Sequence, residues 1–249
     1  MPDLPRRVYV VDGVAGLALI VGLLVSNFIG GETKIERRIE RLHALDDPGF
    51  THEMGALLGP PFLTGNKVGA LLNGDQIFPP MLVAIRGAKE TITFETYIYW
   101  SGDIGQAFAD ALTERARQGV KVHVLLDWVG SAKMDDQMLA VMQDAGVQVR
   151  KFHPPHWSHL GRLNNRTHRK LLVVDGRTGF TGGVGIAPQW TGRAQDPAHW
   201  RDTHFQVEGP AVAQMQSVFI DNWIKVTGDV LSRARRPPPL KPIWPCRMG

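Results

Sequence analysis

Residues 91–126, TITFETYIYWSGDIGQAFADALTERARQGVKVHVLL, contain a strand pattern, a helix pattern and a second strand pattern in succession. The first eight residues alternate along the chain with a period of two, which is typical of a half-buried strand. Apolar residues then recur at helical spacing until Gly119 ends the helix, at Ile104, Phe108, Leu112 and Ala116. Valine and leucine dominate residues 120–126. A strand, a helix and a strand with short links predict a crossover between parallel strands.

The same alternation continues on both sides of this unit. Further strand patterns occupy residues 68–72, 147–152, 168–174, 179–181 and 203–207, and further helix patterns occupy residues 77–85, 135–145 and 209–226. No internal repeat is visible in the chain. These elements predict one α/β domain over residues 65–231, in which helices flank a largely parallel mixed sheet.

The composition and the distribution of charge limit the class of protein. Hydrophobic residues make up 43% of the 249 residues, which excludes a disordered or fibrous chain. The net charge is +4, but residues 232–249 carry five Lys and Arg side chains and no acid, so the remainder has 4 − 5 = −1. These 18 residues also hold five of the 17 prolines and predict a disordered tail. The charge of the domain therefore gives no indication of nucleic acid as a partner. The single cysteine, Cys246, excludes an intrachain disulfide.

The amino-terminal segment predicts a membrane anchor. Residues 13–31 contain 19 residues without a charge, and a helix of that length covers roughly the ~30 Å hydrocarbon core of a bilayer. We therefore expect residues 1–31 to form a single-pass transmembrane helix, followed by a charged amphipathic linker over residues 32–64. A cleaved signal peptide and a buried helix are the alternatives.

The segment that carries chemistry is residues 165–176, NRTHRKLLVVDG, followed by a Gly-Gly pair. In a strand, His168 and Lys170 lie on the same face with roughly 7 Å between their Cα atoms. Lysine supplies a positive charge for phosphate oxygens, and a neutral imidazole attacks phosphorus or carries a proton. The backbone amides of Gly182 and Gly183 are able to approach an anion closely. The combination suits a phosphate diester, and the simpler alternative is a solvated strand edge.

The spacing H-x-K-x4-D-x6-G-G, formed by His168, Lys170, Asp175, Gly182 and Gly183, resembles the signature of the phospholipase D superfamily. Residues 94–100, 125–131 and 200–204 are further similar to the first half of bacterial cardiolipin synthases. This resemblance implies a phospholipase D-like sandwich and a phosphatidyltransferase that acts on phosphatidylglycerol or a similar anionic phospholipid. It also implies a phosphohistidine on His168, a carboxylate of Asp202 that orients this histidine, no cofactor and a bacterial inner-membrane location.

The sequence departs from this family in two ways. Gly185 stands where the family usually has an asparagine, so a side-chain amide for the phosphate is missing. The chain also contains one motif, whereas the family's mechanism uses two histidines. The second motif must then come from a homodimer that joins two His168 side chains, or the chain is a truncated half. A lipid hydrolase, a nuclease and a non-catalytic fragment remain as alternatives.

Two other groups of residues are candidates for function. His153, His156 and His159 are close in sequence, but neighbouring prolines and the absence of a fourth ligand argue against a metal site. Glu95 and Asp127 end strands at the edge where a doubly wound sheet binds ligands. We expect these two acids to be structural side chains or helix caps.

Overall fold

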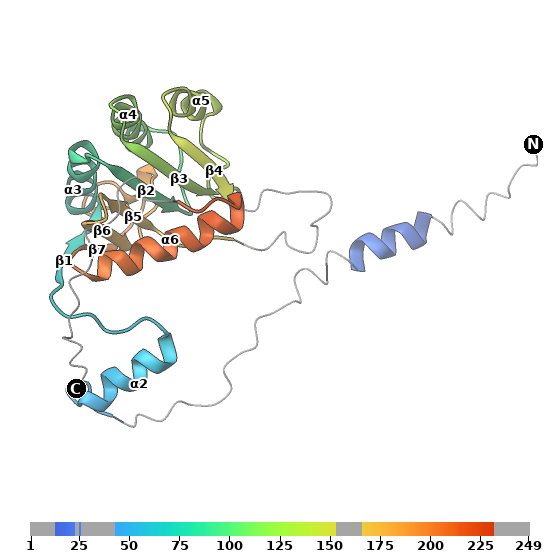
Figure 1. The fold of residues 1–249 in the computed structure, drawn as a ribbon. Coiled ribbons are helices and arrows are strands. Elements are labelled where there is room, and N and C mark those ends of the chain that lie inside the picture. The colour runs from blue at the N-terminus through green and yellow to red at the C-terminus, as the bar shows by residue number, and fades with distance from the viewer. Residues whose placement is uncertain (1–12, 23–24, 26–42, 153–165, 232–249) are drawn as a thin grey trace, which may run out of the picture.

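The computed structural model describes residues 13–22, 25, 43–152 and 166–231. Its centre is a seven-stranded sheet with the strand order β1-β7-β6-β5-β2-β3-β4 (Figure 1). The strands are β1 Lys67–Leu72, β2 Thr91–Thr96, β3 Lys121–Asp127, β4 Gln148–Phe152, β5 Leu171–Val174, β6 Thr178–Gly182 and β7 Thr203–Glu208. Each predicted strand is present close to its expected position.

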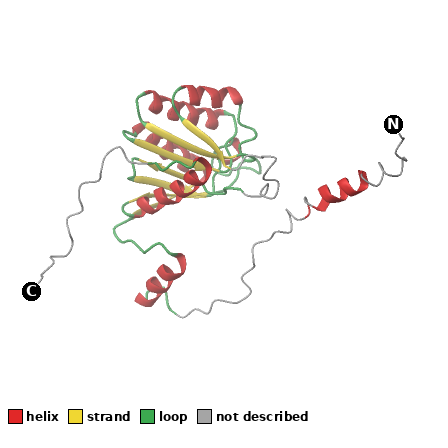
Figure 2. Ribbon diagram, turned by 45° about the vertical axis from the view of Figure 1, so that its right-hand side comes forward, coloured by secondary structure: helices red, strands yellow, loops and turns green. Residues whose placement is uncertain are grey.

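Helices cover both faces of the sheet (Figures 1 and 2). The helices are α2 Pro48–Leu58, α3 Asn73–Gly87, α4 Asp103–Arg117, α5 Asp136–Asp144 and α6 Ala211–Thr227, with a short 3-10 turn over Pro188–Trp190. The core beneath α3, α4 and α5 contains Phe94 and Leu126, and the core beneath α6 contains Leu125 and Val173. Alternate residues of one strand point to opposite faces, so the two cores share the same sheet.

The prediction of a largely parallel sheet is wrong. The pairs β2–β3 and β3–β4 are parallel, whereas β1–β7, β7–β6, β6–β5 and β5–β2 are antiparallel. The crossover helices α4 and α5 explain the two parallel pairs, because parallel neighbours need a long connection. A tight turn joins β5 to β6 instead, and Asp175 and Gly176 adopt positive φ angles of 51° and 62° there. Such a short turn makes the next strand antiparallel.

Strand β5 is shorter than predicted. The pattern indicated a strand over residues 168–174, but β5 begins at Leu171, which pairs with Glu95 of β2 and Thr181 of β6. His168 and Lys170 therefore lie just before the strand. Thr167 forms hydrogen bonds to side chains at the ends of β2 and β3, and these contacts keep the segment out of the regular ladder.

The terminal segments are described only in part. Residues 13–22 form a helix within the predicted anchor. No helix among the described residues combines the length and the apolar character that crossing a bilayer requires. Helix α2 lies within the predicted linker. The predicted tail at residues 232–249 and the loop with His153, His156 and His159 lie outside the described residues.

Candidate active site

His168 and Lys170 lie side by side at the start of β5. The Lys170 Nζ atom lies 3.1 Å from Nδ1 and 3.3 Å from Nε2 of His168, and it donates to the His168 carbonyl oxygen at 3.0 Å. The imidazole packs against the Tyr97 ring, with 4.8 Å between the ring centroids. The structure thus brings together an imidazole, which can act as a nucleophile, and an ammonium, which can bind phosphate oxygens.

The surroundings of His168 favour its neutral form. Burial and the positive charge of Lys170 lower the pKa of His168, and the Asp127 carboxylate opposes this effect. A neutral imidazole has a free nitrogen lone pair, which a nucleophile needs. The lowered pKa therefore favours the neutral imidazole near neutral pH.

Lys170 is buried, with 9% of its surface exposed. Burial lowers the pKa of Lys170, and the negative charge of Asp202 raises it. The ammonium also lies 5.5 Å from the centre of the Tyr97 ring, a favourable cation–π position. Asp202 and Tyr97 therefore favour the charged form of Lys170, which burial disfavours.

Hydrogen bonds from residues other than His168 hold the Asp202 carboxylate. Its Oδ2 atom accepts the indole N–H of Trp190 at 3.0 Å, and its Oδ1 atom accepts the Thr203 N–H at 2.7 Å. Among the described residues, no hydrogen bond joins Asp202 to His168. The orientation of His168 by Asp202 therefore stays a prediction. These two donors fix the carboxylate, whose charge then acts on Lys170.

Gly182 and Gly183 allow β6 to approach β7 closely. A Cβ atom on Gly182 would lie 2.5 Å from the Thr203 carbonyl oxygen, and one on Gly183 would overlap the Asp202 carboxylate. The Gly183 N–H donates to the Thr203 carbonyl oxygen at 3.3 Å. This amide is therefore engaged within the protein, and both glycines make room for the Asp202 segment.

Gly185 has no space for a side chain. A Cβ atom there would lie 2.7 Å from Cβ of Ile98 and 3.0 Å from the Trp190 ring. An asparagine would require both neighbours to move. The glycine thus fits the packing of this chain, and any second donor to a phosphate comes from another residue.

Asp175 lies at the other end of β5. Its carboxylate accepts the backbone N–H groups of Lys89, Glu90 and Thr91 at 2.9, 2.8 and 2.9 Å. The seven residue steps from His168 to Asp175 span about 23 Å when extended. The structure therefore does not bring Asp175 to His168, and the side chain fixes the start of β2 instead.

Two buried acids hold the residue that precedes His168. The Thr167 N–H donates to Asp127 Oδ2 at 3.1 Å, and the Thr167 hydroxyl donates to Glu95 Oε1. The Asn222 side chain donates to the same Glu95 oxygen at 2.7 Å. We call Glu95, Asp127 and Asn222 the Thr167 clamp. Burial raises the pKa of Glu95, and its hydrogen bonds to Thr167 and Asn222 oppose this effect.

The clamp follows from the parallel part of the sheet. Glu95 lies near the carboxyl end of β2 and Asp127 ends β3, and parallel neighbours place these ends at one edge. Both acids are fully buried. The sequence placed them at strand ends, but it gave no signal that both would bind Thr167.

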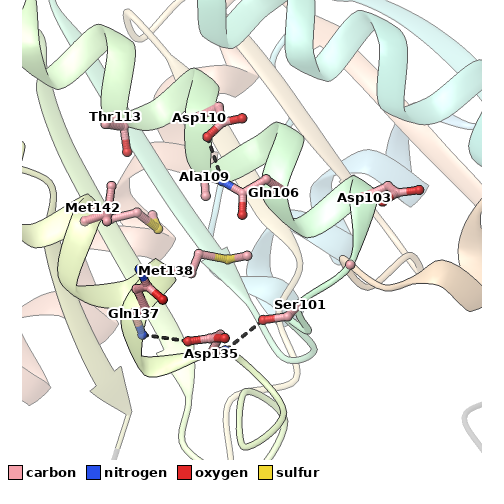
Figure 3. A pocket seen from close by; sticks show the side chains of 12 residues that line it. Ser101, Asp103, Gln106, Ala109, Asp110, Thr113, Asp135, Gln137, Met138 and Met142 are labelled. Atoms are coloured by element: carbon pink, nitrogen blue, oxygen red, sulfur yellow. Dashed lines mark hydrogen bonds between the residues drawn. The ribbon is translucent and has the colours of Figure 1, made fainter.

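The structure contains a cavity beside His168. This cavity has a volume of about 290 Å³, and it is lined by Phe152, Arg166, Thr167, His168, Arg169, Asn222 and Lys225. A second cavity, of about 520 Å³, lies between α4 and α5 (Figure 3). Its charged lining consists of Asp103, Asp110 and Asp135, which disfavours an anionic ligand. The cavity beside His168, which has cationic side chains in its lining, therefore suits an anionic ligand better than the larger cavity does.

Comparison with known proteins identifies the family. The profile described as "Cardiolipin synthase, PLD-like domain" matches residues 81–223. The chain belongs to this family. The matched residues of this cardiolipin synthase-like domain include the His168 segment, the Thr167 clamp and Asp202.

Curated relatives and one solved structure agree with this assignment. Cardiolipin synthase A of Pseudomonas fluorescens (strain SBW25) is 38% identical over 66% of this chain and 34% of its own length. Cardiolipin synthase 1 of Bacillus anthracis is 39% identical over 67% of this chain and 33% of its own length. The matched part of this cardiolipin synthase-like chain thus spans about a third of these relatives. The phospholipase D family member Nuc from Salmonella typhimurium shares the fold, with a TM-score of 0.51 and 16% identity over 65% of this chain and 97% of that one.

Proposed function

We propose that this chain is a phosphatidyltransferase of the cardiolipin synthase type, acting on phosphatidylglycerol or a similar anionic phospholipid. The observation that carries the proposal is the Lys170 ammonium 3.1 Å from Nδ1 of a His168 imidazole whose pKa is lowered. The relatives named cardiolipin synthase support the substrate class. His168 is the proposed nucleophile, Lys170 the phosphate-binding cation and Asp202 the carboxylate that supports Lys170.

The proposed reaction has two displacements at one phosphorus. In the first, a ring nitrogen of His168 forms a bond to phosphorus, the bond from phosphorus to the glycerol oxygen breaks, and the departing alkoxide takes a proton from a general acid. In the second, the hydroxyl of an acceptor lipid gives its proton to the general acid, which is now deprotonated, and its oxygen attacks the same phosphorus while the bond from phosphorus to His168 breaks. Lys170 offsets the negative charge on the non-bridging oxygens in both steps.

The general acid of the first step comes from outside the single motif. We propose that a second histidine supplies the proton, either His168 of a second copy or a histidine of a different chain. Mixing wild-type chain with His168→Ala chain distinguishes these sources. In a homodimer with one shared site, activity falls with the square of the wild-type fraction. With a different second chain, activity falls linearly.

The membrane location remains part of the proposal. An anchor within residues 1–31 would hold the site at the surface where the lipid substrate lies, in the inner membrane of a bacterial cell. Such a tether raises the effective concentration of the site at its substrate. The uncharged stretch at residues 13–31 supports this part of the proposal.

The test compares wild-type chain with His168→Ala in membranes that contain labelled phosphatidylglycerol. We expect wild type to release glycerol and form cardiolipin, and His168→Ala to lose this activity by at least about a thousandfold. His52→Ala, on exposed α2, is the matched control and should retain full activity. Equal product from wild type and His168→Ala would contradict the proposal. Cleavage of DNA with untouched lipid would favour a nuclease, and a monomer without product would favour a non-catalytic fragment.

A further inference from the structure

The cavity beside His168 has a cationic lining. Arg166, Arg169 and Lys225 contribute to it, and none of the described residues that line it is acidic. The three cations come from the segment before β5 and from α6, so the fold gathers them from two separate parts of the chain. We call this space the cationic hollow. Such a cluster of positive charge attracts an anion, most strongly one with several oxygen acceptors.

Arg166 has the most specific position of the three. Its guanidinium lies over the Trp128 ring at 4.6 Å from the ring centroid, which fixes the plane of its donors. Its Nη1 atom is buried and has no hydrogen-bond partner among the described residues. A buried donor without a partner is costly, and a guanidinium cannot remove the cost by losing its proton. An oxygen of a bound anion would satisfy this donor.

The other two cations are only partly engaged. Lys225 pairs with Asp221 at 2.7 Å, but both side chains are more than half exposed, so the pair is weak. One nitrogen of Arg169 donates to the Val218 carbonyl oxygen at 2.9 Å, which fixes the side chain without neutralising it. Arg169 therefore keeps its positive charge beside the cavity, whereas Asp221 offsets part of the charge of Lys225.

We propose that the cationic hollow binds the phosphate of the acceptor phospholipid. This inference rests on the proposed function, in which His168 and Lys170 act on the phosphate of the donor lipid. A phosphatidylglycerol acceptor carries its own phosphate, separated from its attacking hydroxyl by the short glycerol chain. A water molecule, the competing acceptor, has no such group. The volume of about 290 Å³ is near the lower end of ligand pockets, about 300–1,000 Å³, and suits a headgroup.

An acceptor lipid bound in the hollow therefore favours transfer of the phosphatidyl group to lipid over its hydrolysis by water. Holding the acceptor phosphate near the phosphohistidine raises the local concentration of the lipid hydroxyl relative to water. Loss of the hollow should reduce transfer to the lipid while His168 still forms and releases its intermediate. The ratio of cardiolipin to phosphatidic acid measures this difference.

The first experiment measures binding without turnover. Full-length chain is titrated with sn-glycerol 3-phosphate by calorimetry, and glycerol and inorganic phosphate serve as comparison ligands. We expect saturable binding of glycerol 3-phosphate that weakens at least about tenfold in Arg166→Ala and in Lys225→Ala, because each loses a charged contact. Arg86→Ala, an exposed residue on α3, is the matched control and should bind like wild type.

Several results of the binding experiment would overturn the inference. Unchanged affinity in both Arg166→Ala and Lys225→Ala would exclude the hollow as the binding site. Inorganic phosphate that binds as tightly as glycerol 3-phosphate would indicate a site for free phosphate rather than for a headgroup. Arg166→Lys is the conservative variant, because it retains the positive charge. Thermal unfolding of each variant shows whether the fold is intact.

The second experiment measures products from phosphatidylglycerol vesicles. We expect Arg166→Ala to lower the ratio of cardiolipin to phosphatidic acid at least about tenfold, with His168-dependent cleavage kept within about threefold of wild type. An unchanged ratio, or an equal loss of cleavage and transfer, would contradict an acceptor site. Glycerol 3-phosphate binding by a chain that turns over no lipid would contradict the proposed function alone, so the two proposals fail separately.

Discussion

The position of His168 depends on the residue before it. The backbone N–H and the hydroxyl of Thr167 bind two carboxylates from separate strands, Asp127 and Glu95. The Asn222 side chain on α6 donates to the same Glu95 oxygen as the Thr167 hydroxyl. An imidazole next to such a fixed residue loses little further freedom when the substrate binds, which favours a reactive geometry.

Replacing Thr167 by valine tests the clamp. Thr167→Val removes the hydroxyl donor to Glu95 but keeps the shape, so we expect kcat to fall about tenfold and stability to fall by about 1–3 kcal/mol. Thr167→Ser retains the donor and should recover most of kcat. Thr113 is a matched control, because it is equally buried and its hydroxyl has no partner among the described residues. Thr113→Val should change neither quantity, and a Thr167→Val variant with wild-type kcat would exclude a positioning role.

The protonation of His168 depends on its neighbours. Burial and then Lys170 lower its pKa, so removal of the lysine charge by Lys170→Met should raise that pKa. The folded imidazole would then become protonated at a higher pH than in wild type. An NMR titration of the His168 ring in the folded chain measures the shift. A pKa that is unchanged or lower in Lys170→Met would contradict the contact between the two side chains.

At the level of elements, the two ends of β5 carry residues with different structural roles. The start of the strand presents the His168 segment, and Asp175 at its end binds three backbone N–H groups at the beginning of β2. These bonds join two strands that are far apart in sequence and fix their antiparallel register. The register in turn places Glu95 opposite Leu171, where its carboxylate accepts the Thr167 hydroxyl.

Asp175 is therefore expected to matter for folding more than for chemistry. Asp175→Ala should lower the free energy of unfolding by about 1–3 kcal/mol, since three backbone donors lose their acceptor. Urea denaturation measures this loss. The per-molecule activity of the folded fraction should stay within about threefold of wild type. A fully stable but inactive Asp175→Ala chain would instead place this carboxylate in the reaction.

Across the whole molecule, two buried histidines predict a dependence of stability on pH. Burial lowers the pKa of His123 and of His204 to about 4. An unfolded chain titrates its histidines near the ordinary value of about 6.5, so the unfolded state binds more protons between about pH 6.5 and pH 4. The free energy of unfolding should therefore fall as the pH decreases through this range.

Denaturation at about pH 7 and about pH 5 checks this expectation. His123→Phe should reduce the loss of stability at the lower pH, because a phenyl ring retains the edge contact with Trp223 and has no proton to gain. His52→Ala on exposed α2 is the control and should leave the loss unchanged. A wild-type stability that is constant over this range would contradict burial of neutral histidines.

The sequence by itself determined the α/β class, the element positions and the His168–Lys170 pair. Hydrophobic periodicity and short motif spacing are local properties, and residues within a few positions of one another carry them. The tertiary structure decided which strands run antiparallel, that Asp175 lies away from His168, and that Glu95, Asp127 and Asn222 meet at Thr167. The tertiary structure also gathers Arg166 and Lys225 around one cavity. These are contacts between distant parts of the chain, and they depend on strand order and helix packing, which local patterns do not specify.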